Sequence, residues 1–482
     1  MKIVKTAKLK ITSHGDKTFV DTLDIYNKAL SFFISLCDKE WHTLVDLDSN
    51  AQLSLVEKLS HITKNNLHVK YNFSEEFYKF PSYLRRAAIA EALGVVSSHY
   101  SRYVNWLEKK ETKTIQGKTF HEKAPTLNVA PKSFPVFYRK EMFKSSLEKT
   151  QSGAVFGVSF IKVFKDNDWI WIEVSYNHKE LLSSGAYRFR GYKEHNPMLV
   201  KKGKKYFFHI PYETSVTLNS TSLKHQKVIG VDLGLTNSAV CSCIDYNGTV
   251  IDRVFINQSI EKDHLKTAIN KLSKAKRLSG ILNEKPRYWR AINGLQKEII
   301  QDTVNKIIAF AQKHTADVIV FEYLGKIRIP KSFYGAKRLR AKLQYWAKCK
   351  IQDITCKKAH SLGIRYSKVL ARGTSMYAYD GSGKVERSPR KDMATFANNK
   401  TYHADLSASY NIASRYFIRA ILKPLSEKAR LQTEANVPLL ADRTHHTLSS
   451  LIKLHEVLGF ANETSVAPIH DKEASSIETK VA

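Results

Sequence analysis

The fold is decided by the stretch Val228-Ile229-Gly230-Val231-Asp232-Leu233-Gly234, an apolar run in which an acid lies between two glycines. Its β-branched residues predict a short buried strand over 227–233. Two further strands are expected at 239–244 and 249–255. The turn between them contains Asn247-Gly248, a pair that favours a tight hairpin. Three short strands in succession therefore begin this region.

Helices and strands alternate after these three strands. The patterns predict a basic helical stretch over 261–313 with a break near Pro286, a buried strand at 317–321 that ends at Glu322, a helix over 338–362, a strand at 365–369 and a last helix over 405–421. Three hairpin strands followed by helix–strand alternation is the order of a ribonuclease H-like α/β core.

The residues before this core divide into a helical and a β-rich part. Helical periodicity over 19–41 and 81–110 predicts a mainly helical N-terminal region. Between 153 and 210, β-branched and aromatic runs alternate with polar turns and predict a small β domain. A first strand at 3–11 is expected to complete that domain.

Composition limits the partners of this chain. The 482 residues are 43% hydrophobic, which suits a globular protein of several domains, and 77 Lys and Arg against 45 Asp and Glu give a formal charge of +32. Such an excess points to a polyanion, and we expect nucleic acid rather than a membrane because no long apolar run is present. The start of the chain lacks the apolar core of a signal peptide, so we expect a cytoplasmic protein.

Three acids carry the chemistry: Asp232, Glu322 in Val318–Leu324, and Asp405 in Tyr402–Ala408. Each lies on or beside a run expected to be buried, where an ionised carboxylate is costly without a compensating cation or donor. A ribonuclease H-like core would bring the first strand, the fourth strand and the last helix together. The three acids could then bind two Mg²⁺ ions and hydrolyse a phosphodiester. Taken singly, each acid has a plainer interpretation, as a turn residue or, for Asp405, as a helix N-cap.

At these residues the sequence resembles the TnpB family of transposon-encoded nucleases and the compact type V CRISPR effectors that share their architecture. The resemblance covers most of 227–421 and, more weakly, the helical and β regions before it. It is carried by Gly230-Val231-Asp232-Leu233-Gly234, the strand ending in Glu322, the Leu339–Gly363 helix leading into Arg372-Gly373-Thr374-Ser375, and His403-Ala404-Asp405 with Asn411-Ile412-Ala413.

The resemblance implies an RNA-guided DNA endonuclease of the prokaryotic cytoplasm. It would cut a guide-matched target beside a short recognition motif, using Asp232, Glu322 and Asp405 as ligands of two Mg²⁺ ions in a RuvC-like domain. Guide RNA and double-stranded and single-stranded DNA are the implied partners, and the oligomeric state is left open. The implied domains are a first wedge strand (1–15), a helical recognition lobe (16–150), a β wedge domain (151–225), a RuvC-like domain with the first two acids (226–374) and its final helix with the third (400–423).

Two departures from the family are visible. Family members usually carry four zinc-binding cysteines in a target-strand loading segment before the last acid; here those positions fall in 375–399 at Ala378, Gly381, Thr395 and Asn398, so no zinc is expected. Side-chain packing or RNA contacts must then hold this segment, or it must be mobile. The asparagine and second alanine expected after the last acid are Ser407 and Ser409.

Basic stretches interleaved with aromatic residues are expected to contact nucleic acid, since cations neutralise phosphates and rings stack on unpaired bases. The alternative for any single stretch is a solvated helix face. The candidate residues are Lys201, Lys202, Lys204, Lys205, Lys274, Arg277, Arg287, Arg290, Lys326, Arg328, Arg338 and Arg340. The remaining residues, 424–482, are weakly patterned apart from a helix over 448–458, and we expect a poorly ordered tail.

Two other functions stay open on sequence grounds. The lost zinc ligands and the two serines would suit an RNA-guided DNA-binding module without cleavage. A transposase that joins DNA ends also uses three acids on this core. The intact acids favour the endonuclease over the binding module, because a silent site has no reason to keep three buried charges.

Overall fold

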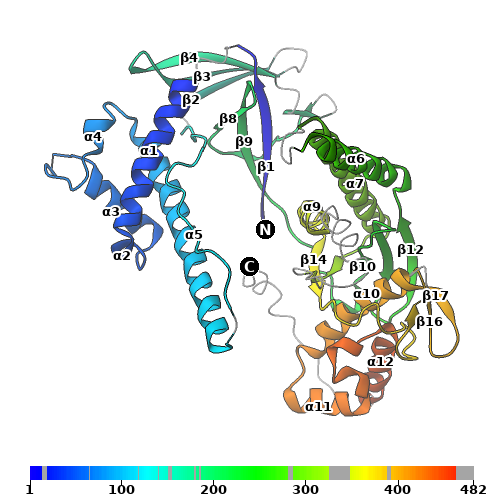
Figure 1. The fold of residues 1–482 in the computed structure, drawn as a ribbon. Helices are drawn as coiled ribbons and strands as arrows, with labels where there is room; N and C mark the ends of the chain where they lie inside the picture. The colour runs from blue at the N-terminus through cyan, green and yellow to red at the C-terminus, as the bar shows by residue number, and fades with distance from the viewer. Residues whose placement is uncertain are drawn as a thin grey trace. The chain divides into compact units, whose positions relative to one another are not determined.

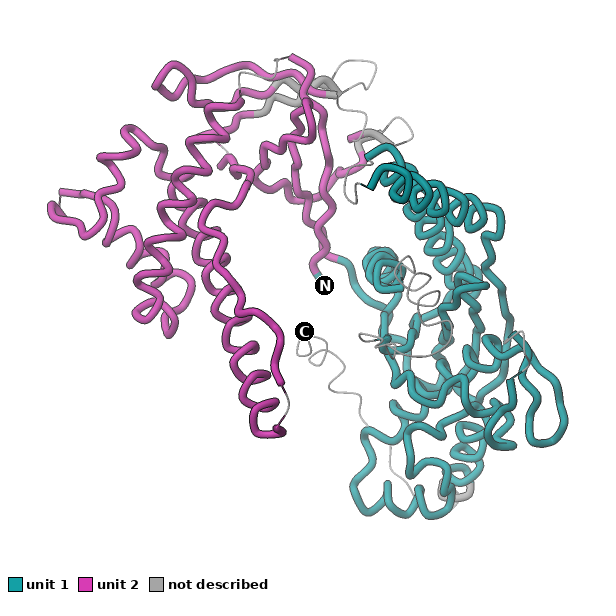
Figure 2. Tube along the Cα trace, viewed as in Figure 1, with its two compact units in different colours: residues 1, 216–482 teal, residues 2–215 magenta. Residues whose placement is uncertain are grey.

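The structure is a computed structural model of the chain. It describes residues 1–13, 19–64, 66–117, 119–138, 140–149, 155–177, 181–183, 186–280, 286–324, 348–387 and 392–462. The chain forms two compact units, one made of Lys2–Ser215 and one made of Met1 together with the residues from Val216 onward (Figure 2). Both helices and strands are present in each unit, so the fold is mixed α/β.

The N-terminal unit is built on a seven-stranded sheet with the order β2-β3-β4-β1-β9-β7, in which β8 also pairs with β9. Strand β1 runs antiparallel to β9, with Ala7 opposite Ile210, and its end pairs with β4. The prediction that the first strand completes the β domain is therefore confirmed. The strands are β1 (Lys2–Ile11), β2 (Phe143–Lys149), β3 (Val155–Lys165), β4 (Asp168–Asn177), β7 (Lys193–Glu194), β8 (Met198–Lys202) and β9 (Lys205–Ser215), with β5 (Leu182–Ser183) and β6 (Ala186–Tyr187) pairing separately.

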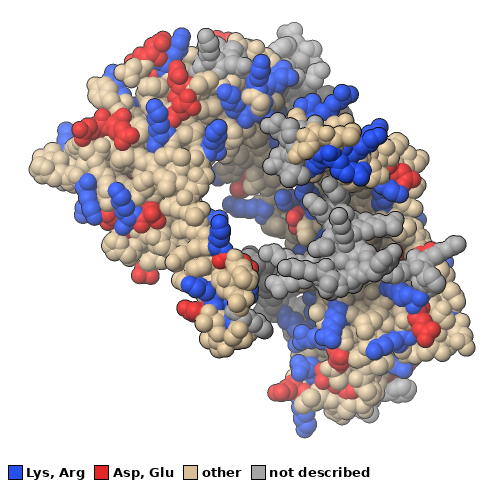
Figure 3. Space-filling model, viewed as in Figure 1, with Lys and Arg blue, Asp and Glu red and all other residues tan. Residues whose placement is uncertain are grey.

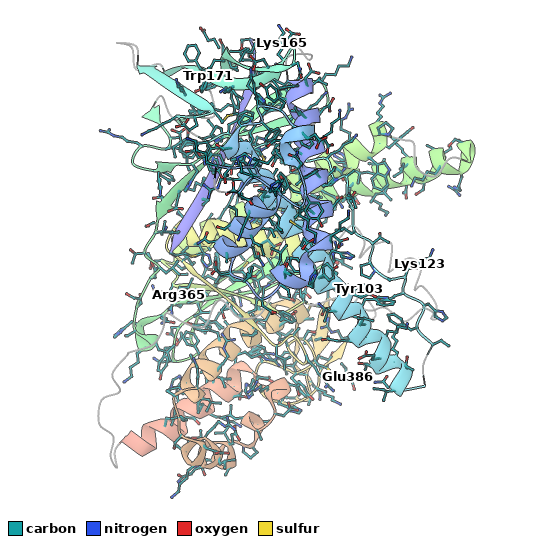
Figure 4. The ribbon with its side chains drawn as sticks, turned by 90° about the vertical axis from the view of Figure 1, so that its left-hand side faces the viewer. Tyr103, Lys123, Lys165, Trp171, Arg365 and Glu386 are labelled. Carbon is teal, nitrogen blue, oxygen red and sulfur yellow. The ribbon has the colours of Figure 1, made fainter. Side chains whose placement is uncertain are left out.

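Helices pack against this sheet in a shared core. Helix α1 lies along α5, whose C-terminal half carries Tyr103, labelled in Figure 4. Buried side chains of α1, α5, β3 and β9, among them Phe33, Ile89, Val163 and Phe208, belong to one apolar cluster. The helices are α1 (Val20–Lys39), α2 (Trp41–Leu44), α3 (Ser49–Ser60), α4 (Phe73–Glu76) and α5 (Ser82–Ile115). The two long helices confirm the periodicities seen in the sequence.

The C-terminal unit contains a five-stranded sheet with the order β12-β11-β10-β13-β14 (Figure 1). The first three strands along the chain are antiparallel, whereas β13 and β14 run parallel to β10. The bounds are β10 (Val228–Asp232), β11 (Ala239–Ile244), β12 (Val250–Ile256), β13 (Val318–Glu322) and β14 (Arg365–Val369). All five strands lie where the sequence predicts them.

Helices cover both faces of this sheet. One face packs on α7 (Pro286–Lys313) and α9 (Lys348–His360) through residues such as Val231 and Phe321, and α6 (Ser259–Ser279) packs on α7. The other face packs on α10 (Ala404–Leu422) through Val228, Val240 and Val320. Alternate residues of β10 thus serve two cores, which explains its unbroken apolar run. Of the predicted helix 338–362, residues 338–347 lie outside the described residues.

The segment after Ser375 forms a small three-stranded sheet of β15 (Glu386–Arg387), β16 (Met393–Thr395) and β17 (Thr401–His403). Glu386, the first residue of β15, is labelled in Figure 4. A small apolar cluster that includes Ala378 and Phe396 packs this segment.

The expectation of a poorly ordered tail from 424 onward is wrong for residues 427–462. These form α11 (Glu427–Asn436), short turns at Pro438–Leu440 and Arg443–His445, and α12 (Leu448–Asn462). Leu440 and Leu451 are buried in the same core as α10. The sequence does not indicate this order because few side chains of α11 are buried, so α11 has no clear apolar stripe. The order of the segment comes from packing against residues that are distant in sequence. Only the helix over 448–458 was foreseen, and residues 463–482 lie outside the described residues.

None of the helices in the described part of the chain combines the length and the apolar character needed to cross a bilayer.

Candidate active site

Two of the three predicted acids end neighbouring parallel strands. Asp232 is the last residue of β10 and Glu322 the last of β13, and the preceding residues, Val231 and Phe321, are opposite each other. Side chains alternate between faces along a strand, so both carboxylates lie on the face that packs on α10. The carboxyl ends of parallel strands meet at one sheet edge, which brings the two acids together.

Two glycines, Gly230 and Gly234, allow the helix that carries the third acid to approach β10 closely. Asp405 lies in the first turn of α10. A Cβ atom on Gly230 would lie 2.9 Å from Ala413 Cβ and still closer to the Ser409 carbonyl, so only glycine lets α10 approach β10 this closely. A Cβ on Gly234 would lie 2.8 Å from the Asn237 carbonyl and 3.5 Å from Asp405 Oδ2. The glycines on either side of Asp232 therefore bring the start of α10 to the end of β10.

The electrostatics of the three acids favour a bound cation. Burial raises the pKa of Asp232 well above its usual range, and the carboxylates of Glu322 and Asp405 raise this pKa further, while Arg387 opposes them. Burial also raises the pKa of Glu322, against the Thr374 hydroxyl and Arg415. A divalent cation would relieve this repulsion, and carboxylate oxygens are the ligands that Mg²⁺ prefers.

This donor chemistry fits Mg²⁺. Within the described ranges, however, no three histidine, cysteine, aspartate or glutamate side chains are close enough to form a ready-made metal-ligand set. The three predicted acids are therefore close enough to raise the pKa of Asp232, but they do not form a closed coordination shell.

Thr374 holds Glu322 and is itself held by α10. The Thr374 hydroxyl donates a hydrogen bond to Glu322 Oε1, and Gln352 Nε2 on α9 donates to the Glu322 carbonyl at 2.9 Å. Asn411 Nδ2 donates to the carbonyls of Thr374 and Tyr377, both at 2.9 Å. In the sequence, Thr374 and Asn411 can be recognised only as parts of motifs, and the structure shows their hydrogen-bond partners.

A buried arginine braces the same loop. Arg415 on α10 is 3% exposed and donates to the carbonyls of Leu370 at 2.5 Å and Arg372 at 2.9 Å. It also donates to the carbonyls of Thr444 at 2.7 Å and His446 at 3.0 Å. Burial lowers the pKa of Arg415 to about 10, and the Glu322 carboxylate opposes this. Arg415 thus ties the loop that carries Thr374 to the C-terminal segment, a role that no sequence pattern indicated.

Ring packing holds the segment over 375–399. Tyr379 contacts Phe396 and Tyr402, with ring centroids 5.6 Å and 5.0 Å apart. The positions of the missing zinc ligands have other uses: Ala378 is buried in the small core, and Asn398 Nδ2 donates to Asp380 Oδ2 at 3.1 Å. In the described residues of this segment, side-chain packing therefore contributes to its order.

The two serines that depart from the family pattern both make hydrogen bonds. Ser407 Oγ accepts a hydrogen bond from the Tyr379 backbone N–H at 3.2 Å, which ties α10 to the segment over 375–399. Ser409 Oγ donates to the Leu406 carbonyl at 2.8 Å, within α10.

The predicted nucleic-acid residues fall into two groups, one in each unit. Lys201, Lys202, Lys204 and Lys205 are exposed on the β8–β9 hairpin. Lys274 and Arg277 are exposed on α6, and Arg287 and Arg290 on α7. Figure 3 shows Lys and Arg side chains gathered over α6. Lys326, Arg328, Arg338 and Arg340 lie outside the described residues.

Comparisons with known proteins give a partial family match and a broad structural similarity. The model of the Aq_aa04 family matches residues 5–165, which lie in the N-terminal unit. No curated protein sequence matches the chain.

The structure is similar to the Cas12f1–sgRNA–target DNA complex, with a TM-score of 0.45 and 14% identity over 86% of this chain and 99% of that chain. For CasPhi-2 (Cas12j) bound to crRNA, the TM-score is 0.43 and the identity 11% over 86% of this chain and 98% of that chain. For Alicyclobacillus acidoterrestris C2c1 with single-guide RNA, the values are 0.36 and 9% over 80% and 65%.

Proposed function

We propose that this chain is an RNA-guided DNA endonuclease whose C-terminal unit is a ribonuclease H-like, RuvC-like nuclease domain. The observation that carries the proposal is that Asp232 and Glu322 end neighbouring parallel strands, while the Asp405 carboxylate at the start of α10 is close enough to raise the pKa of Asp232. The strand order β12-β11-β10-β13-β14, with two parallel strands beside an antiparallel hairpin, is the order that such a core requires.

Asp232, Glu322 and Asp405 would hold two Mg²⁺ ions. Bound there, the ions would activate a water molecule and stabilise the leaving oxygen of a DNA phosphodiester. The protein's own groups prepare this site. Thr374 donates to Glu322 and so favours its ionised form, while Arg415 fixes the loop that carries Thr374.

The proposal that guide RNA and a DNA target are the partners is supported by the motif resemblance and by the charge of +32. A basic protein can grip the backbone of a guide–target duplex while base pairing reads the sequence. In this proposal the N-terminal helices form the recognition lobe and the β-rich part forms the wedge domain. Residues 375–399 act as the target-strand loading segment without zinc.

The test begins with the full chain purified without nuclease treatment, followed by sequencing of the bound nucleic acid. The proposal expects a discrete RNA with a constant scaffold and a variable end. That complex should cut matched DNA in Mg²⁺ and leave mismatched DNA intact. Tight binding without cleavage would favour a DNA-binding module, and strand-transfer products formed without RNA would favour a transposase; either result overturns the endonuclease.

A further inference from the structure

A row of side chains crosses the five-stranded sheet from the acids to its edge. Asp232 on β10 is opposite Val240 on β11, and Val240 is opposite Phe255 on β12. Paired residues point to the same face, so Phe255 lies on the acid-bearing face of the sheet. Two strand spacings put the Cα atoms of Asp232 and Phe255 about 10 Å apart.

Phe255 presents an aromatic surface at the open end of this row. Val240, in the middle of the row, is buried under α10, whereas Phe255 is 44% exposed on the edge strand. The ring of Phe255 meets that of His403 edge-on, with centroids 4.8 Å apart and planes at 74°. His403 precedes Asp405 by two residues, and β12 and β17 lie side by side in Figure 1. The His403 ring thus supports Phe255 beside the third acid.

A cationic side chain lies beside Phe255 on β12. Arg253 lies on the same face of β12, is exposed, and donates to the hydroxyls of Tyr402 at 3.3 Å and Tyr410 at 3.5 Å. The acid next to it, Asp252, belongs to the opposite face, where it pairs with Lys313 at 2.8 Å. An arginine beside an exposed ring suits a nucleic-acid strand, because the arginine can contact a phosphate while the ring stacks on a base. A protein partner would need a wider apolar patch than one ring.

We propose that Phe255, supported by His403, stacks on an unpaired base of the strand that the acids cut, while Arg253 neutralises a neighbouring phosphate. The inference rests on the proposed function and adds the residues that would hold the substrate strand. At 3.4 Å for each stacked nucleotide, the base lies within about three nucleotides of the phosphate at the acids. Phe255 is then a substrate-positioning residue.

The test measures binding apart from cleavage. Single-stranded 20-mers carrying 2-aminopurine are titrated into the full chain bearing Asp232→Ala, alone and combined with Phe255→Ala, Phe255→Trp or Ile251→Ala. Ile251 is the control, because it is an apolar residue that is 41% exposed on the same edge strand. None of the three β12 substitutions changes the charge, so binding to the basic surfaces is the same in all of them.

We expect Phe255→Ala to weaken oligonucleotide binding about tenfold and to reduce 2-aminopurine quenching. Phe255→Trp should restore both readouts, and Ile251→Ala should stay within about twofold. In the active chain, Phe255→Ala should raise KM for target DNA with little change in kcat. Equal effects of Phe255→Ala and Ile251→Ala would overturn the proposal, as would a change in oligomeric state without a change in binding. The binding assay does not depend on cleavage, so it tests the role of Phe255 even if the chain does not cut DNA.

Discussion

The acid cluster and the segment over 375–399 are neighbours in the C-terminal unit, yet they are stabilised in opposite ways. At the acid cluster, burial raises the pKa of Asp232, and the neighbouring carboxylates of Glu322 and Asp405 raise it further, so negative charge is in excess there. In the segment, two of the positions at which the resemblance implies cysteines make other contacts, since Ala378 packs in a small core and Asn398 makes a hydrogen bond. A metal ion is therefore expected to matter at the first place and not at the second. The absence of cysteines from the segment is therefore no argument against Mg²⁺ at the acids.

Removing an acid should give the largest effect. Asp232→Ala, Glu322→Ala or Asp405→Ala should each lower the rate of DNA cleavage at least about 10²–10³-fold, because each removes a ligand of the Mg²⁺ ions that would stabilise the transition state. Binding of guide and target should change little. Asp353→Asn, at an exposed acid on α9, is the matched control and should cleave normally. Single-turnover kinetics and filter binding measure both quantities, and full activity in any acid variant contradicts the site.

Replacing Arg415, which holds the loop that carries Thr374, should have the second-largest effect. Arg415→Ala leaves four backbone carbonyls without their donor, which should destabilise the chain by about 3 kcal/mol. The melting temperature should fall by roughly 6–12 °C, and Arg415→Lys should recover part of this loss. Calorimetry without nucleic acid measures the shift. An unchanged melting temperature would show that the C-terminal segment does not support the loop.

Thr374→Val should change how the cleavage rate depends on pH. The valine keeps the volume but cannot donate to Glu322, so the pKa of Glu322 should rise further. Ionised Glu322 is needed to hold the cation, so the acid limb of the pH–rate profile should move to higher pH, by about one unit. Thr374→Ser keeps the donor and should behave like the wild type. Cleavage rates between pH 5 and 8 decide this, and an unmoved limb would contradict the role of Thr374.

Asp232→Asn tests the repulsion without any catalysis. The folded state raises the pKa of Asp232, so it retains a proton that the unfolded state releases, and stability falls as pH rises from the unfolded pKa toward the folded one. With chelator at neutral pH, Asp232→Asn should therefore raise the melting temperature by about 2–4 °C for each kcal/mol of repulsion removed. Adding Mg²⁺ should stabilise the wild type more than the variant. An equal response of both proteins would place the Mg²⁺ elsewhere.

The smallest effects should come from the segment over 375–399. Tyr402→Phe removes the hydroxyl that lies 3.1 Å from the Tyr410 hydroxyl, which should cost about 1 kcal/mol. A zinc chelator should leave the melting temperature and the proteolysis pattern of this segment unchanged. Limited proteolysis with and without the chelator tests this, and a chelator-dependent cut between 375 and 399 would show that a metal holds the segment after all.

Much of the C-terminal fold was predictable because its signals are local. Strands such as β10 and β13 are continuous apolar runs, and their order along the chain indicates the sheet. The acids could be named since each lies on or beside a run that is expected to be buried. What fixes them could not be predicted: Arg415 and Thr374 act through backbone carbonyls and one carboxylate far away in sequence, and such partners leave no periodic pattern. The order of residues 427–447 could not be predicted for the same reason, since Leu440 gains its burial from the core that it shares with α10.

The most direct test of the central claim is to count divalent ions at the three acids. Mn²⁺ prefers the same oxygen ligands as Mg²⁺ and can be followed by electron paramagnetic resonance in the full chain. The wild type should bind two more Mn²⁺ ions than the Asp232→Asn, Glu322→Gln, Asp405→Asn triple variant prepared with the same RNA content, and the two ions should be magnetically coupled. Equal binding by both proteins would contradict the account, because the meeting of the acids would then not be a metal site.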